Sequence, residues 1–195
     1  MKEVPAWLAL LSGMSLLSGV LGSVVTLAVT GLVFLVRRPK LRMTFTAVQR
    51  GCVVDTPSQG GQQRALRIFV ENRGWTTAHN VNVSAIELAF YPQVGTSSGL
   101  VDEVLEFHLA LSDVTRFDLA QGAHRWVDVV FADDLGQGVT LRLGFLVRPL
   151  RLTLLNFGQR GSYSFEVIAT GDNASAKRQR INFHWDGSLR GLRIT

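Results

Sequence analysis

The chain has 195 residues, of which 47% are hydrophobic and 18% are charged, and its formal net charge is +5 at pH 7. It contains no P-loop and no G-x-G-x-x-G after a strand pattern, and its one G-x-S-x-G match, at residues 95–99, lies in a predicted Gly- and Ser-rich turn, so no hydrolase, nucleotide or dinucleotide motif indicates an enzyme. We therefore expect a protein that is not an enzyme and that needs no cofactor and no metal ion.

The N-terminal segment predicts a membrane span. No residue from Trp7 to Val36 is charged, which makes 30 uncharged residues in a row. About 20 apolar residues of helix cross a bilayer core of roughly 30 Å. Pro5 suits a first helical turn and Pro39 ends the helix on the other side. We expect an N-tail at residues 1–6 and a tilted transmembrane helix at residues 7–36.

Basic residues flanking the span predict its orientation. Only Lys2, with Glu3 beside it, precedes the span, whereas a basic segment at residues 37–42 follows it and contains Arg37, Arg38, Lys40 and Arg42. The positive-inside rule places the C-terminal part in the cytoplasm and the N-terminus outside a plasma or bacterial inner membrane. A cleaved secretory signal is the rival interpretation. It is disfavoured because the chain starts nearly neutral and has basic residues where cleavage would be expected.

Small residues repeat along the predicted span at a spacing of four. They form two rows three residues apart, which share one helical face: Ser15, Gly19 and Ser23, beside Ser18, Gly22, Thr26 and Thr30. Small residues let helices approach closely in lipid. The rows predict a packing face for a second helix, from another copy or another subunit, although such residues are also common in spans that pack against nothing.

The positive charge is concentrated beside the span. Lys2 and Glu3 precede it, so 19 basic and 14 acidic residues follow, and without the four of the basic segment the remainder is 15 against 14. This segment is expected to contact lipid headgroups, and a nearly neutral domain does not favour nucleic-acid binding. A local group at Lys177, Arg178 and Arg180 is most simply solvated, with a contact to lipid phosphates or an acidic partner as the alternative.

Residues 43–195 predict one β-sandwich domain of about eight or nine antiparallel strands. Period-two alternation or apolar runs, separated by Gly- and Asn-rich turns, predict strands near 41–48, 66–70, 80–91, 106–111, 125–131, 139–147, 150–155, 163–169 and 180–185. Residues 100–106 are expected to form a helical turn. The predicted core consists of Leu66, Ile68, Val70, Val81, Val83, Trp126, Val127, Val129, Leu141, Leu143, Tyr163, Phe165, Val167, Ile181, Phe183 and Trp185.

One hairpin resembles a known family. Residues 66–83, with Val70-x-Asn72-x-Gly74 followed by Ala78-x-Asn80-Val81-x-Val83, are similar to the hairpin of immunoglobulin-like CARDB-type bacterial domains. Residues 117–122 resemble the L-x-x-G segment that precedes a mid-domain strand in that family, and residues 161–167 resemble its G-x-Y-x-F-x-V strand. The resemblance therefore covers roughly residues 64–170. It implies an immunoglobulin-like sandwich that mediates interaction without catalysis. The inward topology departs from the family, whose members are usually exported.

Within that hairpin, Asn72 and Gly74 are expected at left-handed positions of the turn, and the Asn80 side chain is expected to bond the turn backbone.

The remaining polar residues predict no reactive site. The four histidines, His79, His108, His124 and His184, are dispersed and lack the close spacing of zinc ligands. Asp133, Asp134 and Gly136 are interpreted as a plain turn rather than a calcium loop. Cys52 is the only cysteine, so it forms no internal disulfide, and an inert, partly buried thiol is the expectation.

These patterns together predict a membrane-anchored, non-catalytic protein-interaction module. Its expected partners are the lipid bilayer, a second transmembrane helix and an unidentified protein. A small accessory subunit of a larger membrane complex is the alternative, and an enzyme with an unrecognised site is the third hypothesis.

Overall fold

The computed structural model describes residues 6–58, 61–93, 99–101, 105–107, 114–134, 136, 138–144 and 158–195, with the backbone only at residues 6–19, 35, 58, 99–101 and 105–106. The chain divides into two compact units, Met1–Arg38 and Pro39–Thr195.

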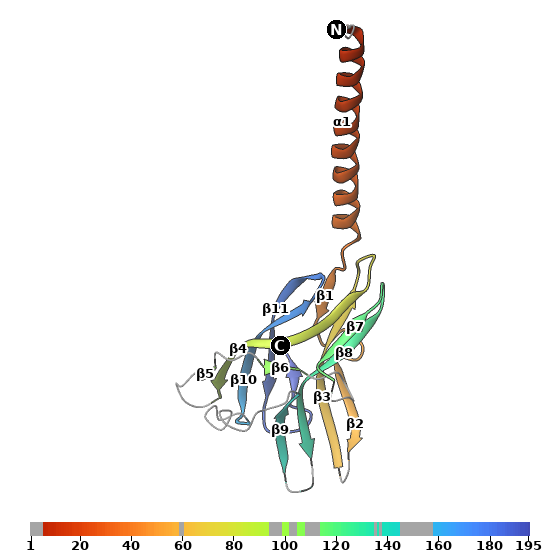
Figure 1. Ribbon diagram of the computed structural model, residues 1–195. Coiled ribbons are helices and arrows are strands. Elements are labelled where there is room, and N and C mark those ends of the chain that lie inside the picture. Colours follow the sequence, from red (N-terminus) through yellow and green to blue (C-terminus); the bar gives the residue numbers. More distant parts are fainter. Residues whose placement is uncertain are drawn as a thin grey trace. The chain divides into compact units, whose positions relative to one another are not determined.

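The first unit holds helix α1, Ala6–Arg37 (Figure 1). Its bounds lie within one residue of the predicted helix, because the stretch has no proline before Pro39, whose ring is incompatible with a continuing helix. Among the residues that the structure describes, no helix combines the length and apolar character that crossing a bilayer requires. The predicted membrane span is therefore not supported by the structure.

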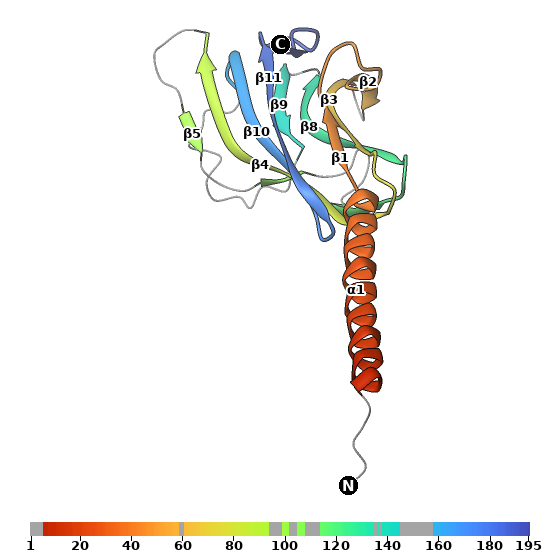
Figure 2. The ribbon, with the colours of Figure 1, turned by 90° about the horizontal axis from the view of Figure 1, so that it is seen from above.

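The second unit is a β-sandwich of two antiparallel sheets, with twelve strands in the described residues (Figures 1 and 2). Sheet 1 has the order β1-β3-β8-β9, and β2 also pairs with β3. Its strands are β1 Leu41–Thr44, β2 Val53–Ser58, β3 Gly61–Asn72, β8 His124–Asp134 and β9 Val139–Leu143. This confirms the predicted β-sandwich at the level of two antiparallel sheets.

Sheet 2 has the order β12-β11-β10-β4-β5, and β6 and β7 also pair with β4. Its strands are β4 Ala78–Pro92, β5 Gly99–Val101, β6 Leu105–Glu106, β7 Arg116–Leu119, β10 Gly161–Gly171, β11 Ala174–Trp185 and β12 Arg193–Ile194. The long β10–β11 hairpin follows the strict alternation of its sequence, because one face of each strand packs into the core.

The core lies between the two sheets and includes most of the predicted residues. Tyr163 stacks between Phe90 and Phe183, with ring centroids 4.7 and 4.9 Å away. Trp126 and Leu143 were predicted to lie in the core, but both side chains are only partly buried. Trp126 lies on the other face of sheet 1, where its ring packs against Phe69 at 4.9 Å.

Several predicted elements differ from the structure. The helical turn expected at 100–106 is wrong in its described part, which contains strands β5 and β6. The strand expected at 150–155 lies outside the described residues. Strands β2, β7 and β12 were not predicted. Strands β7 and β12 are too short to show a clear alternation. Strand β2 contains Asp55 and Pro57, which are rare in strand interiors.

Candidate interaction site

The chain enters the sandwich at the end where β1 begins, and three turns meet there. We define this entry end by residues 39–43, 71–80, 117–125 and 171–178. Leu41 pairs with Asn72, and the Arg73 N–H donates to the Lys40 carbonyl at 2.8 Å. The β10–β11 turn joins them, because the Asp172 N–H donates to the His79 carbonyl at 3.0 Å. Segments far apart in sequence thus form one surface.

Asn72 connects these segments from a fully buried position. Its Oδ1 accepts hydrogen bonds from the N–H groups of Lys40 at 3.1 Å and Gly74 at 2.9 Å. Its Nδ2 donates to the carbonyls of Thr76 at 2.7 Å and Leu119 at 2.9 Å. The expected left-handed turn is wrong, since neither Asn72 nor Gly74 has a positive φ. The side chain satisfies the turn backbone instead, as short amide side chains often do.

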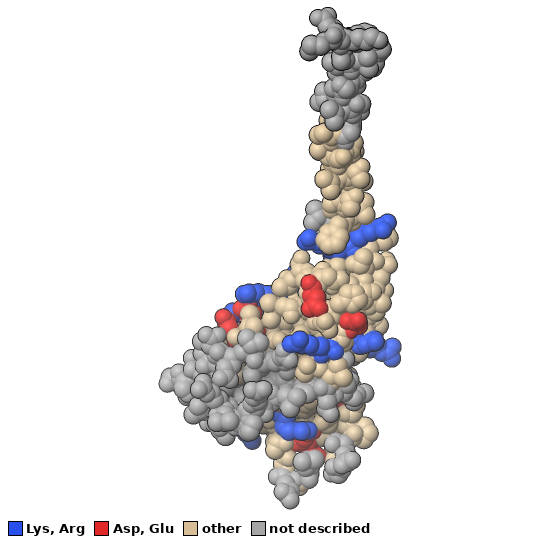
Figure 3. Space-filling view, viewed as in Figure 1, with Lys and Arg blue, Asp and Glu red and all other residues tan. Residues whose placement is uncertain are grey.

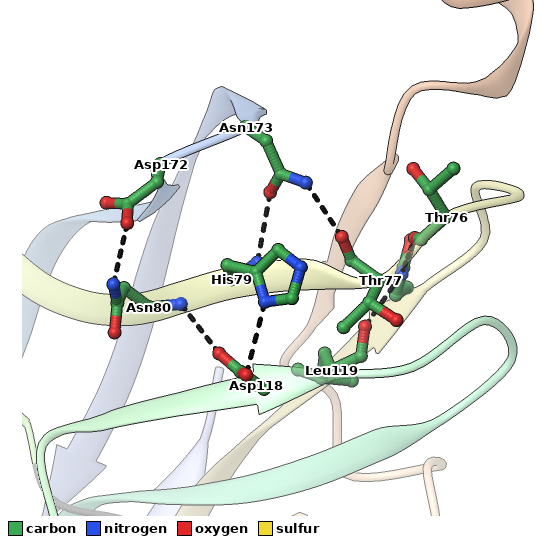
Figure 4. A network of polar contacts seen from close by, with 9 residues as sticks. Thr76, Thr77, His79, Asn80, Asp118, Leu119, Asp172 and Asn173 are labelled. Carbon is green, nitrogen blue, oxygen red and sulfur yellow. Dashed lines mark hydrogen bonds and ion pairs between the residues drawn. The ribbon is translucent and has the colours of Figure 1, made fainter.

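A second polar network lies on the surface of the entry end (Figure 4). The Asp118 carboxylate accepts the Asn80 N–H at 2.9 Å and lies 3.1 Å from Nδ1 of His79. The Asn173 side chain accepts the His79 N–H at 3.0 Å and donates to the Thr77 carbonyl at 2.8 Å. These contacts join β4, β7 and the β10–β11 turn, so their groups hold the backbone of this end in place.

Asn80 is the one non-glycine residue with a positive φ among the described residues, at 49°. Its Nδ2 donates to Asp172 at 2.6 Å, so the expectation that it bonds the adjacent turn backbone is wrong. Asparagine tolerates the left-handed region better than most residues. The hydrogen bond from the Asn80 N–H, followed by the contact with His79, lowers the pKa of Asp118 below its usual value.

Trp75 is the large aromatic residue that the turn between β3 and β4 presents to solvent. Its side chain is 65% exposed. An exposed tryptophan is uncommon on a surface with no partner, because the ring combines a large apolar area with one polar N–H. Trp75 was not among the predicted site residues, although its position between Gly74 and Thr76 in a predicted turn was a usable signal.

The basic residues predicted to face lipid are exposed. Arg37 and Arg38 close the helical unit, and the Arg38 guanidinium lies 5.3 Å from the centre of the Phe34 ring. Lys40 and Arg42 belong to the sandwich unit, and Arg42 pairs with Glu71 across β1 and β3. Exposed cations beside an aromatic ring suit an interface between water and an apolar phase.

The predicted packing face is described in part. Four of its residues are exposed on α1: Gly22, Ser23, Thr26 and Thr30. The Thr26 hydroxyl donates to the Gly22 carbonyl at 2.8 Å. A Cβ added at Gly22 would touch nothing within 4 Å. For Ser15, Ser18 and Gly19 only the helical backbone is described. Their spacing of four residues does fall within one continuous helix, as predicted.

The far end of the sandwich has a cleft of about 350 Å³, lined by Asp55, Thr56, Pro57, Gln62, Arg64, Leu189 and Arg190. Its charged groups bind one another. The Arg64 guanidinium donates to both carboxylate oxygens of Asp55, at 2.6 and 2.7 Å, and to the Arg190 carbonyl at 3.0 Å. This pairing raises the pKa of Arg64 and lowers that of Asp55. These contacts join β2, β3 and the C-terminal segment. The charged groups of the cleft therefore face one another and do not form the nucleophile–base pair of a catalytic site.

No group of three His, Cys, Asp or Glu side chains in the described part of the chain could hold a metal ion. His79, His124 and His184 are described and His108 is not. Asp133, which was considered for a calcium loop, is buried and binds Gln63 and Arg142. Cys52 is fully buried, and burial raises the pKa of its thiol. Its inertness is a prediction that this burial supports.

No family model matches the chain, and the comparison with curated proteins found no match. The resemblance to CARDB-type domains therefore stays a prediction. The candidate site rests on the geometry of the entry end and on the apolar and basic pattern before it.

Proposed function

We propose that this protein is a single-pass membrane protein whose β-sandwich is a cytoplasmic, non-catalytic interaction module. The N-terminus lies outside, and the basic segment with Arg37, Arg38, Lys40 and Arg42 contacts anionic headgroups. The membrane is the plasma membrane or the bacterial inner membrane. The tether gives the sandwich a high local concentration beside other membrane proteins, so that weak contacts suffice for recognition.

The observation that carries the proposal is the apolar surface of α1. Large hydrophobic side chains are exposed along the part of the helix whose side chains are described, among them Leu21 at 62%, Leu27 at 73% and Phe34 at 65%. Figure 3 shows the described side chains of residues 20–34 as one uncharged stretch. A helix that is hydrophobic all round needs apolar surroundings. The 30 uncharged residues of the sequence supply a length that suits a bilayer.

The interaction role of the sandwich is supported by its fold and its surface. Figure 3 shows acidic and basic side chains mixed over the described part of one face. An immunoglobulin-like sandwich, which the resemblance implies, presents loops at its ends that commonly bind partners. The entry end, with its immobilised turns and exposed Trp75, is such a surface.

Extraction of cell membranes at alkaline pH tests the tether. We expect the full chain to stay with the membrane pellet. Replacing both Leu21 and Leu27 by Arg should release it, because each central arginine costs about 2.5–3.5 kcal/mol of insertion. Replacing the same residues by Phe is the matched control and should leave it in the pellet. Release of the unaltered chain would contradict the proposal.

The helix partner is tested by recovery of bound proteins from a mild detergent extract. Gly19→Leu together with Gly22→Leu should reduce the recovery of a specific partner or of a second copy, because the added side chains prevent close approach. An added Cβ at Gly22 meets nothing within 4 Å, so there is room for a larger side chain at this position. Unchanged recovery would count against the packing face.

The two rows of small residues also favour a second function, that of an accessory subunit in a larger membrane complex. The mass of the detergent-purified assembly separates the two functions. A stable, stoichiometric complex that survives dilution supports the subunit. A monomer or a pair of copies that binds partners reversibly supports the interaction module.

A further inference from the structure

We infer that the entry end of the sandwich docks on the surface of the anionic bilayer, through Trp75 and four exposed cations, Lys40, Arg42, Lys177 and Arg178. The inference rests on the proposed membrane tether and extends it. Contact with lipid is thereby extended from the basic segment to Trp75, Lys177 and Arg178 of the folded domain.

The two ends of the sandwich differ in charge. The four ranges of the entry end contain six cations and three carboxylates: Lys40, Arg42, Arg73, Arg125, Lys177 and Arg178 against Glu71, Asp118 and Asp172. At the far end, ranges 55–64, 131–142, 158–162 and 185–191 contain four of each: Arg64, Arg142, Arg160 and Arg190 against Asp55, Asp133, Asp134 and Asp186. A positive end attracts phosphate and carboxylate headgroups.

The fold brings the two basic segments of the sequence together. Strand β1 packs against β11, and Figures 1 and 2 both show the β10–β11 hairpin beside the start of β1. Asn173 fixes the tip of that hairpin to Thr77 and His79. Lys177 and Arg178 follow the tip on β11 and are exposed. Lys40 and Arg42 therefore share the entry end with cations about 135 positions later in the chain.

The carboxylates of the entry end are engaged by neighbouring groups. Glu71 accepts a hydrogen bond from Nε of Arg73 at 2.7 Å. Asp118 accepts from Asn80 and lies beside His79, and Asp172 accepts from Asn80 at 2.6 Å. Arg178 pairs with Glu166 at 3.5 Å, and the arginine side chain is 66% exposed. Such a long, exposed contact leaves the guanidinium open to a headgroup.

Trp75 supplies the second chemistry that a lipid surface recognises. Tryptophan concentrates at the boundary between headgroups and acyl chains, because its ring is apolar and its N–H is polar. The turn that carries Trp75 is held to Lys40 by the bond from Arg73 N–H to the Lys40 carbonyl. A soluble acidic protein would be attracted by the cations alone, whereas a bilayer uses both groups.

The tether places this end within reach of the membrane. Four peptide links join Arg37, the last residue of α1, to Leu41, the first of β1. Their Cα atoms therefore lie within about 15 Å of each other for any orientation of the helix. That upper limit is about one and a half times the Debye length of roughly 10 Å at 0.1 M salt, so the attraction between this end and the headgroups should depend strongly on salt.

Quenching of Trp75 by lipid tests the inference. The full chain is reconstituted into vesicles of phosphatidylcholine with brominated acyl chains, with or without phosphatidylserine. The emission of Trp75 is the difference between the unaltered protein and Trp75→Phe, which removes the contributions of Trp7, Trp126 and Trp185. We expect several-fold stronger quenching in the vesicles with phosphatidylserine, and a loss of this gain at high salt.

Charge variants identify the surface. Lys177→Glu combined with Arg178→Glu should abolish the gain in quenching that phosphatidylserine causes. Arg190→Glu, an exposed cation at the far end whose contact with Arg64 uses only its carbonyl, is the matched control and should keep the gain. Equal quenching in both lipids, or an equal effect of both variants, would overturn the inference.

Flotation of the same vesicles separates this inference from the proposed function. A chain that floats with the lipid but whose Trp75 emission is not quenched contradicts the inference alone. A chain that does not float contradicts the tether and the inference together. A soluble quencher gives a further test. If Trp75 is protected from it in native membranes but not in vesicles that contain this chain as the only protein, the surface binds a protein and the lipid assignment is overturned.

Discussion

Arg67 and Asp128 form an ion pair within the sandwich, with Nε donating to Oδ1 at 2.7 Å and side chains only 10% and 7% exposed. The two residues pair across β3 and β8, beside a shift in strand register between Leu66 and Arg67. Gly144 closes over them, since a Cβ there would lie 2.3 Å from the Asp128 carbonyl oxygen. Buried charges of this kind need their partners, because either one alone would lack solvation.

Removal of one member of this pair is expected to destabilise the sandwich strongly. Arg67→Met should lower the free energy of unfolding by about 3–5 kcal/mol, because the buried Asp128 carboxylate loses the guanidinium that pairs with it. Urea unfolding of the full chain in detergent, followed by tryptophan fluorescence, measures the change. The double variant Arg67→Met with Asp128→Leu should recover most of the lost unfolding free energy, because it leaves no charge in the buried site of the pair.

The matched control for this prediction is Arg73→Met. Arg73 pairs with Glu71 at the same distance of 2.7 Å, but its side chain is 56% exposed. A solvated pair contributes only about 0–1 kcal/mol. Equal losses for Arg67→Met and Arg73→Met would show that burial of the first pair does not matter.

The Arg67–Asp128 pair also shows what the sequence predicts and what it does not. Alternation of apolar residues predicted the core of β10, β11 and most of β3, because one side of each strand is buried. The register shift beside Arg67 breaks that alternation between β3 and β8. No local pattern predicts a bulge. Trp126 lies on the face with Phe69 because it adjoins the buried Val127, and adjacent residues of a strand point to opposite faces.

The sequence predicted the cations of the candidate site but not Trp75. Lys40 and Arg42 could be identified from their place after the span, and Lys177 and Arg178 from their spacing. Their meeting at one end depends on the packing of β1 against β11, which is a tertiary contact. The bonds of Asn72 to Thr76 and to Leu119, which lies 47 positions away, likewise follow from topology and not from the turn sequence.

Asn72→Ala is expected to loosen the entry end. The substitution leaves the Lys40 and Gly74 N–H groups and the Leu119 carbonyl without the amide that binds them. Unpaired buried polar groups cost about 1–3 kcal/mol each, so the total loss of unfolding free energy should be about 3 kcal/mol or more. Hydrogen exchange should quicken in residues 73–78 and 119–123. Asn182→Ala, at an exposed position on β11, is the control and should change neither measurement.

Stability is expected to fall in acid in part through Asp118. The Asn80 N–H and then His79 hold the pKa of Asp118 below its usual value of 3.8. A carboxylate whose pKa is lower in the folded state binds fewer protons there than in the unfolded state. Its stabilising effect is therefore complete above pH 3.8 and is lost as the pH falls through the lower, folded-state pKa.

Asp118→Asn tests this pH dependence, because the amide oxygen can still accept the Asn80 N–H but carries no charge. The midpoint of urea unfolding, measured from pH 6 down to about 2.5, should decline less steeply in the variant than in the unaltered chain. Asp55 and Asp186, whose pKa values are also lowered, should supply the decline that remains. Parallel curves for the two proteins would rule out a contribution from Asp118.

Labelling of an introduced cysteine is expected to show the side of the membrane on which the sandwich lies. Val48, in the loop between β1 and β2, is 92% exposed, whereas the native Cys52 is fully buried. An impermeant maleimide should therefore leave the unaltered chain unmodified and modify Val48→Cys only after cell lysis, because the sandwich is proposed to be cytoplasmic. Val4→Cys, in the N-tail, should react in intact cells. Reaction of Val48→Cys before lysis would place the sandwich outside and would remove the cytoplasmic headgroups as the surface on which the entry end docks.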